Sequence, residues 1–376
     1  MSLMNIVIIG GLHHNTLGVL RSLGENGCSK NNLDMILIGD DIDDNNFISK
    51  SKYIDSKRVL CVNEENKIPN KLIDLAKDKV KRVVVACSDG ATEVIINNKE
   101  VLQKYFLLPD TKMNISDLML KEVQSELALE AGFSIPEGKV IRRDDLSDWD
   151  IFPCITKPIK SSIGAGKADI HIANNRNELL DFLKVTDSEY VQIQHYLNKK
   201  MEYQLIGCSL NAGEKIIIPG YTDIIRQPDN TNTGYLLYTP IEKFEYDKKA
   251  VESFIKKIGY SGLFSLEFIR DENKKDYFLE INMRNDGNAY CVKTAGINLP
   301  YIWCYYMWNN EMPDENITFE TPVYFMPEFN DIKMGIKSVG LLKWLMQFCQ
   351  AKSHAIFNMK DIKPFIKKTT DKLFRH

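Results

Sequence analysis

The sequence lacks the cysteine and histidine spacings of a disulfide framework or a zinc site. Its eight cysteines are scattered over 376 residues without a C-x-x-C pair, and its six histidines form no ligand cluster. Several cysteines, among them Cys87 and Cys208, lie inside apolar runs that are typical of strands. Reduced, buried thiols in a cytoplasmic protein fit this pattern better than disulfides or bound zinc do.

Long apolar runs and a strong excess of one charge are also missing. No run approaches the roughly 18 apolar residues of a membrane-spanning helix. The start, Met1–Met4, does not read as a signal peptide, and we interpret residues 1–3 as a short cloning addition before a native Met4. A net charge of -3 and a pI near 6.1 argue against a general nucleic-acid binder.

Two common phosphate-binding fingerprints are absent. The loop G-x-x-x-x-G-K-[ST] does not occur, and the glycine-containing turn Gly10–Gly18 is not G-x-G-x-x-G. A tight turn at the edge of a sheet explains this stretch better than a dinucleotide site does. A dinucleotide-dependent oxidoreductase built on residues 5–40 is therefore only a distant alternative.

The chain is long enough for two to three domains. Residues 5–110 alternate between apolar strands and helices, which indicates a parallel, doubly wound sheet. Beyond Pro109 we predict a helix over 116–131, with Ser116 as its N-cap and Gly132 as its end. Strands dominate from there to residue 284, and two small sheets are expected to meet near residue 195.

The stretch from 265 to 284 predicts two strands joined by a charged turn. Glu280, Asn282 and Arg284 share one face because strand side chains alternate, and central pairing would place Glu267 beside Glu280. Carboxylate and amide oxygens suit Mg²⁺, and an arginine fork suits phosphoryl or carboxylate oxygens. The alternative is a solvated polar face of an antiparallel sheet.

A second polar stretch begins at Lys157, which follows an apolar strand. The turn after it contains small residues that let a phosphate chain approach backbone N–H groups, although an ordinary glycine hairpin has the same composition. These small residues are Ser161, Ser162, Gly164 and Gly166.

The order of these features resembles the ATP-grasp superfamily over about residues 5–310. Lys121 lies 11 residues before Gly132, as the first ATP lysine of the family precedes its Ala-Gly, and residues 155–170 resemble its second lysine strand and glycine flap. The 13-residue step from Glu267 to Glu280 resembles the spacing of the two magnesium acids.

Between these motifs lies a stretch that resembles the hinge whose backbone hydrogen-bonds adenine. The resemblance makes Gln194, His195 and Leu197 adenine-binding residues. Glu202 resembles the acid that holds the ribose hydroxyls, although one extra residue separates it from the hinge.

Residues 280–300 are similar to the carbamoyl phosphate synthetase large-subunit-like, biotin carboxylase-like branch. One grasp unit, with neither a glutaminase nor a biotin-attachment domain, favours a stand-alone ligase within this branch. The resemblance implies a mixed α/β and α+β fold with a Rossmann-like pre-ATP-grasp domain (1–110), a first ATP-grasp lobe (111–195), a second lobe (196–310) and a basic C-terminal extension (311–376).

The resemblance implies an ADP-forming enzyme that joins a carboxylate to an amine or a thiol through an acyl phosphate. Lys121 and Lys157 would hold ATP phosphates. One or two Mg²⁺ ions, for which Mn²⁺ can substitute, would be held by three residues, namely Glu267, Glu280 and Asn282.

Three residues would also serve the reaction itself. Arg284, with Asn282 beside it, would neutralise the transferred phosphoryl group, and Arg226 would seat the substrate carboxylate. The expected substrates are small molecules, either amino acids or a sugar acid of an envelope polysaccharide. A non-catalytic ATP-binding regulatory module, and an enzyme that forms carboxyphosphate as carbamoyl phosphate synthetase does, are the alternatives.

The C-terminal tail differs in charge from the rest of the chain. Residues 333–376 carry ten Lys or Arg and two Asp, and Leu341–Gln350 predicts a short apolar helix. Packing on its own domain, or on a sister subunit of a homodimer, is the main expectation. Weak contact with an anionic membrane surface is the second.

Overall fold

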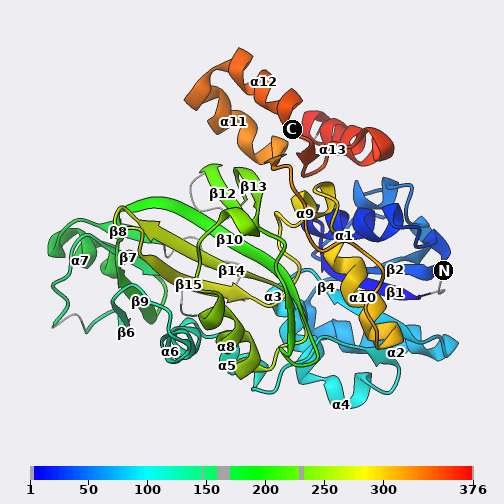
Figure 1. Ribbon diagram of the computed structural model, residues 1–376, viewed down its shortest axis with the longest axis horizontal. Coiled ribbons are helices and arrows are strands. Elements are labelled where there is room, and N and C mark those ends of the chain that lie inside the picture. The colour runs from blue at the N-terminus through cyan, green and yellow to red at the C-terminus, as the bar shows by residue number, and fades with distance from the viewer. Residues whose placement is uncertain (1–3, 146–147, 158, 160–169, 228–232, 375–376) are drawn as a thin grey trace.

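The computed structural model of this chain describes residues 4–145, 148–157, 159, 170–227 and 233–374. Within these residues it contains three sheets, of five, four and eight strands. Figure 1 shows the five-stranded N-terminal sheet on one side, the small four-stranded sheet on the other and the large sheet between them.

The N-terminal sheet is parallel, in the order β3-β2-β1-β4-β5, and confirms the predicted doubly wound domain. The strand order reverses between β1 and β4, which is where ligands bind in such sheets. The elements of this domain are β1 (Ile6–Gly11), α1 (His14–Glu25), β2 (Leu33–Ile38), β3 (Val59–Val62), α2 (Ile68–Leu75), β4 (Arg82–Ala86), α3 (Asp89–Asn97), α4 (Lys99–Leu102) and β5 (Phe106–Leu107).

The single helix predicted over 116–131 is wrong, because two helices occupy this stretch: α5 (Ile115–Leu118) and α6 (Lys121–Ala131). Asn114, and not Ser116, caps α5, since its side chain accepts hydrogen bonds from two backbone N–H groups at the start of the helix. Lys121 therefore lies in the first turn of a new helix. α6 ends at Gly132 with φ 104°, a conformation that glycine adopts at little cost.

The small sheet is antiparallel, in the order β6-β9-β7-β8, and α7 covers it. Its core is apolar and includes Trp149, Cys154 and Ile193. Its elements are β6 (Gly138–Arg142), β7 (Cys154–Lys157), β8 (His171–Ala173), α7 (Arg176–Val185) and β9 (Tyr190–His195).

The large sheet runs β15-β14-β10-β12-β13-β16-β17, with β11 paired to β10. β10 follows β9 after three residues, so the chain passes from one sheet to the next near residue 195, as predicted. Its elements are β10 (Lys199–Leu210), β11 (Lys215–Ile217), β12 (Gly220–Arg226), β13 (Tyr235–Pro240), α8 (Lys248–Ile258), β14 (Gly262–Asp271), β15 (Asp276–Asn282), α9 (Tyr290–Thr294), α10 (Leu299–Asn309), β16 (Val323–Met326) and β17 (Ser353–His354).

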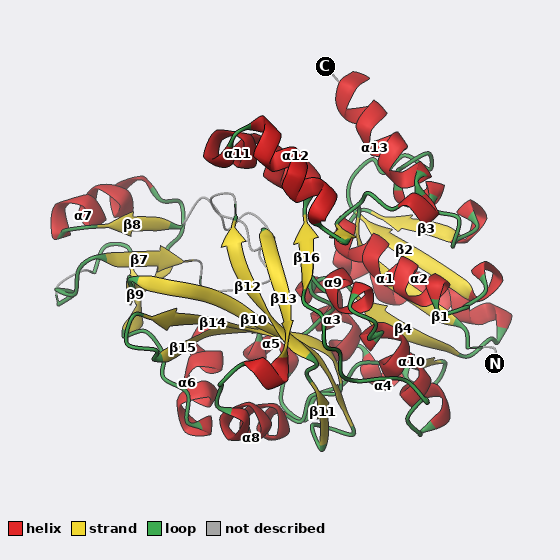
Figure 2. Cartoon of the chain, turned by 45° about the horizontal axis from the view of Figure 1, so that its top comes forward, coloured by secondary structure: helices red, strands yellow, loops and turns green. Residues whose placement is uncertain are grey.

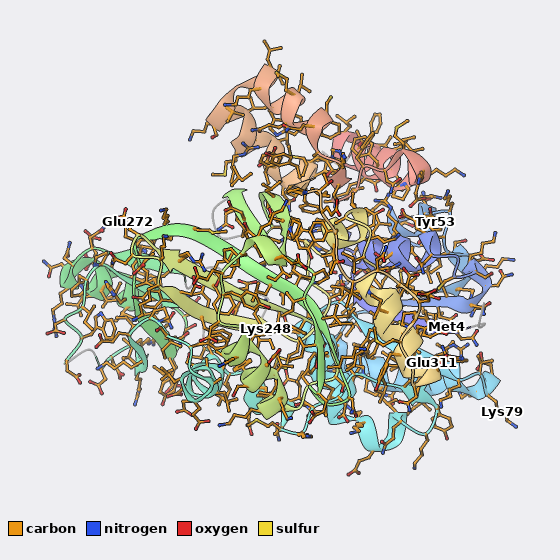
Figure 3. The ribbon with its side chains drawn as sticks, in the orientation of Figure 1. Met4, Tyr53, Lys79, Lys248, Glu272 and Glu311 are labelled. Carbon is orange, nitrogen blue, oxygen red and sulfur yellow. The ribbon has the colours of Figure 1, made fainter. Side chains whose placement is uncertain are left out.

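One face of the β14–β15 hairpin builds the core of this lobe. Leu266, Phe268, Phe278 and Ile281 are buried there against α6 and α8. Figure 2 shows both helices on the same side of the large sheet. In Figure 3, Glu272 in the hairpin turn lies toward the small sheet, opposite Tyr53 and Lys79 of the N-terminal domain. The other face of the hairpin is left for polar residues.

The C-terminal segment belongs to this architecture and is not a detached tail. It adds β16 and β17 to the edge of the large sheet and then forms α11 (Glu328–Val339), α12 (Leu341–Gln350) and α13 (Lys363–Phe374). A buried ion pair of 3.0 Å joins Arg21 on α1 to Asp361 just before α13. No helix among the described residues is long and apolar enough to cross a membrane.

Candidate active site

The hairpin of β14 and β15 pairs as the sequence predicts, with Glu267 opposite Glu280 and Ser265 opposite Asn282. β10 lies on the other side of β14 and places Gln204 opposite Glu267. Side chains that face each other on adjacent strands are in contact distance. A polar row of Gln204, Glu267 and Glu280 therefore crosses three neighbouring strands.

Gln204 and Glu267 of this polar row are buried, the Glu280 side chain is 12% exposed, and the row is internally hydrogen-bonded. The side-chain amides of Gln204 and Asn282 both donate to Oε1 of Glu267, at 3.0 and 2.9 Å. Burial, followed by the neighbouring Glu280 carboxylate, raises the pKa of Glu267 well above its usual value. A buried carboxylate and a partly buried one side by side repel each other, so the arrangement favours a bound cation.

One cation of the protein already lies against the row. The Nζ of Lys121, in the first turn of α6, is 2.9 Å from Oε2 of Glu280. Burial alone would raise the pKa of Glu280 and lower that of Lys121. The ion pair outweighs burial in both groups, so the pKa of Glu280 is lowered and the pKa of Lys121 is raised.

Lys157, at the end of β7 in the small sheet, is the second lysine of the site. Burial, and then the neighbouring Lys121 ammonium group, lower its pKa to about 8 against the opposing effect of Glu280 and Glu202. A bound anion beside it would raise this pKa again. The fold therefore brings both predicted phosphate-binding lysines to the polar row, Lys121 from α6 and Lys157 from β7 of the small sheet.

Arg284 follows the hairpin and lies between the large sheet and the N-terminal domain. Its guanidinium is 3.4 Å from Oδ2 of Asp89 and 3.1 Å from Oδ2 of Asp286, and it donates to the side-chain oxygen of Asn282 at 2.9 Å. Burial would lower the pKa of Arg284, but Asp89 and Asp286 outweigh it and raise the pKa. Because Asp89 begins α3, the N-terminal domain contributes directly to this site.

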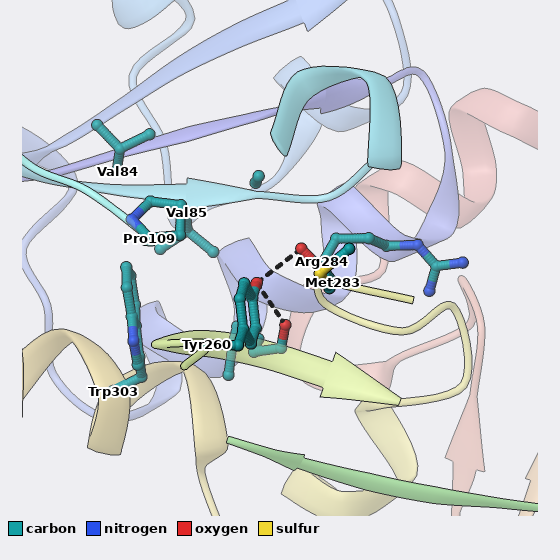
Figure 4. A pocket seen from close by; sticks show the side chains of 9 residues that line it. Val84, Val85, Pro109, Tyr260, Met283, Arg284 and Trp303 are labelled. Carbon is teal, nitrogen blue, oxygen red and sulfur yellow. Dashed lines mark hydrogen bonds between the residues drawn. The ribbon is translucent and has the colours of Figure 1, made fainter. Parts of the chain in front are cut away.

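The backbone just before Arg284 is held by hydrogen bonds from two sides. Tyr260 donates to the Met283 carbonyl at 2.7 Å, and Thr92 on α3 donates to the same carbonyl at 2.9 Å. Figure 4 shows this Tyr260 contact, and shows the Arg284 side chain extending away from Tyr260. The position of Arg284 is therefore fixed by both domains.

The loop after β15 also fills the point where the strand order of the N-terminal sheet reverses. Asn15, in the first turn of α1, donates to the carbonyls of Cys87 and Asn285 at 2.9 and 2.7 Å. Asn285 donates back to the side-chain oxygen of Asn15. The first helical turn after Gly10–Gly11 thus packs against the segment that carries Arg284.

The predicted hinge lies where β9 passes into β10. The His195 N–H donates to the Glu137 carbonyl at 2.7 Å, and Gln194 is buried at the end of β9. A Cβ on Gly138 would lie 2.7 Å from Cγ of Gln194, so only glycine allows this packing. That Gln194, His195 and Leu197 bind adenine stays a prediction.

Glu202 lies on β10 close to this hinge. Its carboxylate is 2.6 Å from Nζ of Lys199, and its role as a ribose ligand stays a prediction. The four small residues of the predicted glycine flap, Ser161, Ser162, Gly164 and Gly166, lie outside the described residues.

Arg226, which was expected to seat a substrate carboxylate, is engaged elsewhere. Its Nε and Nη2 donate to the two carboxylate oxygens of Asp331 on α11, at 2.9 and 2.7 Å, and its guanidinium lies 5.0 Å from the Tyr235 ring centre. Arg226 is 9% exposed and Asp331 is fully buried. This bidentate pair occupies the guanidinium nitrogens that would bind a substrate carboxylate. The structure therefore argues against Arg226 as the residue that seats the substrate.

Sequence reasoning missed three side chains of the site, namely Gln204, Asp89 and Asp286. Gln204 lies two residues after Glu202 on one strand face, so strand alternation could have identified it. Asp89 follows β4 at the carboxyl edge of a parallel sheet, where ligands bind. Asp286 lies in a loop, and no spacing rule connects it to Arg284.

Glu267, Glu280 and Asn282 offer the hard oxygen donors that Mg²⁺ prefers. The described residues contain no group of three or more His, Cys, Asp or Glu side chains that could hold a metal ion. The donor set at the hairpin is therefore two carboxylates and one amide, which suits an ion that keeps further positions for water or phosphate oxygens.

Comparison with proteins of known identity gives distant relatives. No protein-family model matches the chain. It is 23% identical over 269 residues to the D-aspartate ligase of Enterococcus faecium (strain Aus0004), which covers 61% of this chain and 60% of that protein. It is 31% identical over 140 residues to the 2-oxoglutarate carboxylase small subunit of Hydrogenobacter thermophilus (strain DSM 6534 / IAM 12695 / TK-6), which covers 34% and 29%. The matches thus span less than two thirds of either relative.

Solved structures give a closer comparison at the level of the fold. The biotin carboxylase domain dimer of the Hydrogenobacter thermophilus 2-oxoglutarate carboxylase, in complex with MgADP, ADP and bicarbonate, has a TM-score of 0.64 and 19% identity, and covers 86% of this chain and 74% of that one. N5-carboxyaminoimidazole synthetase from Staphylococcus aureus has a TM-score of 0.62 with 14% identity, covering 86% and 82%. The L-amino acid ligase of Bacillus licheniformis has a TM-score of 0.61 with 13% identity, covering 82% and 75%. This chain has the ATP-grasp fold, which it shares with these solved structures.

Proposed function

We propose that the protein is an ATP- and Mg²⁺-dependent, ADP-forming ligase that joins a carboxylate to an amine. One observation carries this proposal: buried Glu267 faces Glu280 in the polar row, and Lys121 is bound to Glu280 with both of these side chains less than 20% exposed. Two carboxylates and a lysine held together with little access to water are costly to a fold unless a ligand uses them. The relatives named above are ligases and carboxylases, which supports an enzyme of this class.

ATP would lie between the small sheet and the large one. In this proposal Lys121 and Lys157 neutralise its phosphates, and the hinge residues Gln194, His195 and Leu197 hold the adenine through their backbone. Glu202 holds the ribose, with Lys199 at 2.6 Å orienting its carboxylate. The residues of the flap, Ser161, Ser162, Gly164 and Gly166, would cover the phosphates.

Glu267, Glu280 and Asn282 would hold one or two Mg²⁺ ions. When bound, Mg²⁺ neutralises phosphate oxygens and aligns the terminal phosphate for transfer. A bound divalent cation would oppose the effects that raise the pKa of Glu267, because it favours the ionised carboxylate. Lys121 would then exchange its contact with Glu280 for a contact with phosphate.

The reaction needs little covalent chemistry from the protein. A substrate carboxylate oxygen attacks the γ-phosphorus of ATP, the bond to the β-γ bridging oxygen breaks, and ADP leaves. An amine then attacks the acyl carbon, loses a proton and expels inorganic phosphate. Arg284 is suited to neutralise the charge of the acyl phosphate, because it stays protonated and the fold fixes its backbone from two sides.

An amino acid is the substrate class that the relatives support best. Two of them are a D-aspartate ligase and an L-amino acid ligase. A thiol could replace the amine without change to the ATP site. Bicarbonate is the second candidate for the carboxylate, since it is present in the 2-oxoglutarate carboxylase domain structure, and it would give carboxyphosphate.

The setting of the reaction is part of the proposal. All eight cysteines are free thiols and five are buried, which fits work in the reducing cytoplasm. A homodimer is proposed by analogy with the domain dimer named above.

An ADP-release screen tests the proposal. The protein is incubated with Mg²⁺ and ATP, with D- and L-amino acids as amines, and with organic carboxylates or bicarbonate as acids. Release of ADP and phosphate that needs both partners supports the ligase. Release of AMP and pyrophosphate would identify an adenylating enzyme, and ATP binding without turnover across the panel would identify a regulatory module.

A matched pair of variants ties the result to the site. Glu280→Gln removes a carboxylate of the polar row, and Glu272→Gln removes an exposed carboxylate from the turn of the same hairpin. Activity should disappear in the first variant and persist in the second. Equal activity in both would reject the assignment of Glu280.

A further inference from the structure

The helix α12 carries an apolar surface that the described residues leave exposed. We call it the apolar stripe; it consists of Leu341 (54% exposed), Leu342 (79%), Leu345 (44%) and Met346 (71%). Residues three to five positions apart lie on neighbouring parts of a helix, so these four form one continuous face of α12. Trp344 lies on another face, where it is buried and donates to Asp331 at 2.8 Å. α12 is therefore anchored by one face and exposes its apolar one.

Lysines accompany this stripe on the same pair of helices. Lys333 and Lys337 stand one turn apart on α11, Lys343 lies on α12, and Lys352 follows its end. All four are exposed. The surface around the stripe is thus cationic.

The acidic residues of this segment do not offset these lysines at the surface. Glu328, Asp331 and Asp361 are buried, and Asp371 is bound to Lys367 at 2.5 Å. None of the four carboxylates among residues 328–374 is exposed. The exposed surface of this segment is therefore positively charged, although the segment also contains four acidic residues.

Each buried carboxylate has a structural partner that explains its position. Glu328 accepts from the backbone N–H groups of residues 355–357. Asp331 pairs with Arg226, and Asp361 pairs with Arg21. Internal contacts thus use up the negative charges, and the lysines remain for an external partner.

We propose that the apolar stripe and its flanking lysines dock on an anionic lipid surface. An interfacial helix combines Leu-rich apolar contacts with lysines that reach acidic headgroups. A second copy of this chain fits less well, because a two-fold contact would bring the same lysines of both copies together. Figures 1 and 2 both show α11 and α12 at the outer edge of the molecule, beyond the ends of β12 and β13, where a flat surface can reach them.

Vesicle co-flotation of the full chain tests the proposal without reference to enzyme activity. The probes are vesicles of phosphatidylcholine alone and vesicles of phosphatidylcholine with phosphatidylglycerol. The wild-type protein should float with the anionic vesicles and stay behind with the neutral ones. High salt should release it, because screening weakens the lysine contacts.

Two variants separate the apolar and the cationic contributions. Leu342→Glu with Met346→Glu should abolish flotation, and Lys337→Glu with Lys343→Glu should lower it by about tenfold or more. The matched control is Val185→Glu on α7, which replaces a valine that is 77% exposed far from the stripe and should leave flotation unchanged. Circular dichroism melting of each variant checks that the fold persists.

Three outcomes would overturn the proposal. The first is absence of flotation with anionic vesicles, and the second is flotation that the stripe variant does not change. The third is a wild-type dimer in light scattering that the stripe variant converts to a monomer, which would assign the stripe to a second copy of the chain.

Discussion

Arg284 and Arg226 each pair with aspartate, with side chains 16% and 6% exposed, yet they differ in what surrounds the pair. Arg226 places two nitrogens on the two oxygens of a single carboxylate, Asp331. Arg284 divides its contacts among Asn282, Asp89 and Asp286. The first is a closed pair, and the second belongs to a group of charges drawn from two domains.

The neighbours of each arginine sharpen the difference. The indole of Trp344 donates to Asp331, and the Tyr235 ring lies over Arg226, so little of this pair faces anything else. Near Arg284, the facing carboxylates Glu267 and Glu280 share the polar row. Excess charge in one buried place, and not a buried arginine as such, therefore marks a site that binds ligands.

The largest effect is expected from Glu280→Gln. The change removes a proposed magnesium ligand and the partner of Lys121, so kcat for ADP release should fall by roughly a thousandfold. Thermal unfolding and steady-state ADP release, measured beside Glu272→Gln, check this expectation. Wild-type turnover in Glu280→Gln would show that the polar row does not take part in catalysis.

A conservative change at Arg284 should also act on catalysis. Arg284→Lys keeps the charge but loses the planar fork, and kcat should fall by about a hundredfold while ATP affinity changes little. Separate determination of kcat and of the ATP dissociation constant distinguishes these effects. A loss confined to ATP affinity would move Arg284 from the transferred phosphoryl group to the nucleotide.

The same change at Arg226 should act on stability instead. Arg226→Lys cannot bind both oxygens of Asp331, and the free energy of unfolding should fall by about 1–3 kcal/mol. Turnover of the folded variant should stay within about threefold of wild type. Denaturant unfolding and ADP release measure the two quantities; a stable but inactive variant would restore Arg226 as a substrate ligand and break the comparison.

The smallest effect is a pH dependence that arises at Lys157. Its pKa of about 8 means that the free protein loses this positive charge as the pH rises through 8. If Lys157 holds an ATP phosphate as proposed, ATP affinity should be full below pH 8 and should weaken above it by up to about tenfold per pH unit. Calorimetric titrations from pH 7 to pH 9.5 measure this slope, and Lys157→Arg should flatten it. An equal slope in both proteins would assign the titration to another group.

The sequence was sufficient to predict the structure wherever a local pattern decides it. Alternation and a charged turn predicted the hairpin and the pair Glu267–Glu280. The ladder from Arg270 opposite Asp276 to Phe268 opposite Phe278 shifts by one residue before Glu267, and this irregularity brings Glu267 opposite Glu280. Alternating strands and helices predicted the parallel N-terminal sheet. The fold class depended on such local signals taken in order.

Contacts between segments that are distant in the chain could not be predicted from the sequence. Asp89 meets Arg284, and Asn15 meets Asn285, across about 200 and 270 residues of chain, and no periodicity links such positions. The pairing of Arg226 could not be predicted for the same reason, since its partner Asp331 lies 105 residues later in the chain. The division of the predicted helix before Lys121 was also missed. Asn114 caps a separate short helix, α5, and α6 begins only at Lys121.

The most direct test of the ligase follows an oxygen atom. A substrate carboxylate labelled with ¹⁸O is converted in the presence of ATP and Mg²⁺, and the released inorganic phosphate is examined by mass spectrometry. An acyl phosphate transfers one carboxylate oxygen to phosphate, so the label should appear there in proportion to the product formed. Label in AMP, or unlabelled phosphate at full product yield, would contradict an acyl phosphate formed at the Glu267–Glu280 site.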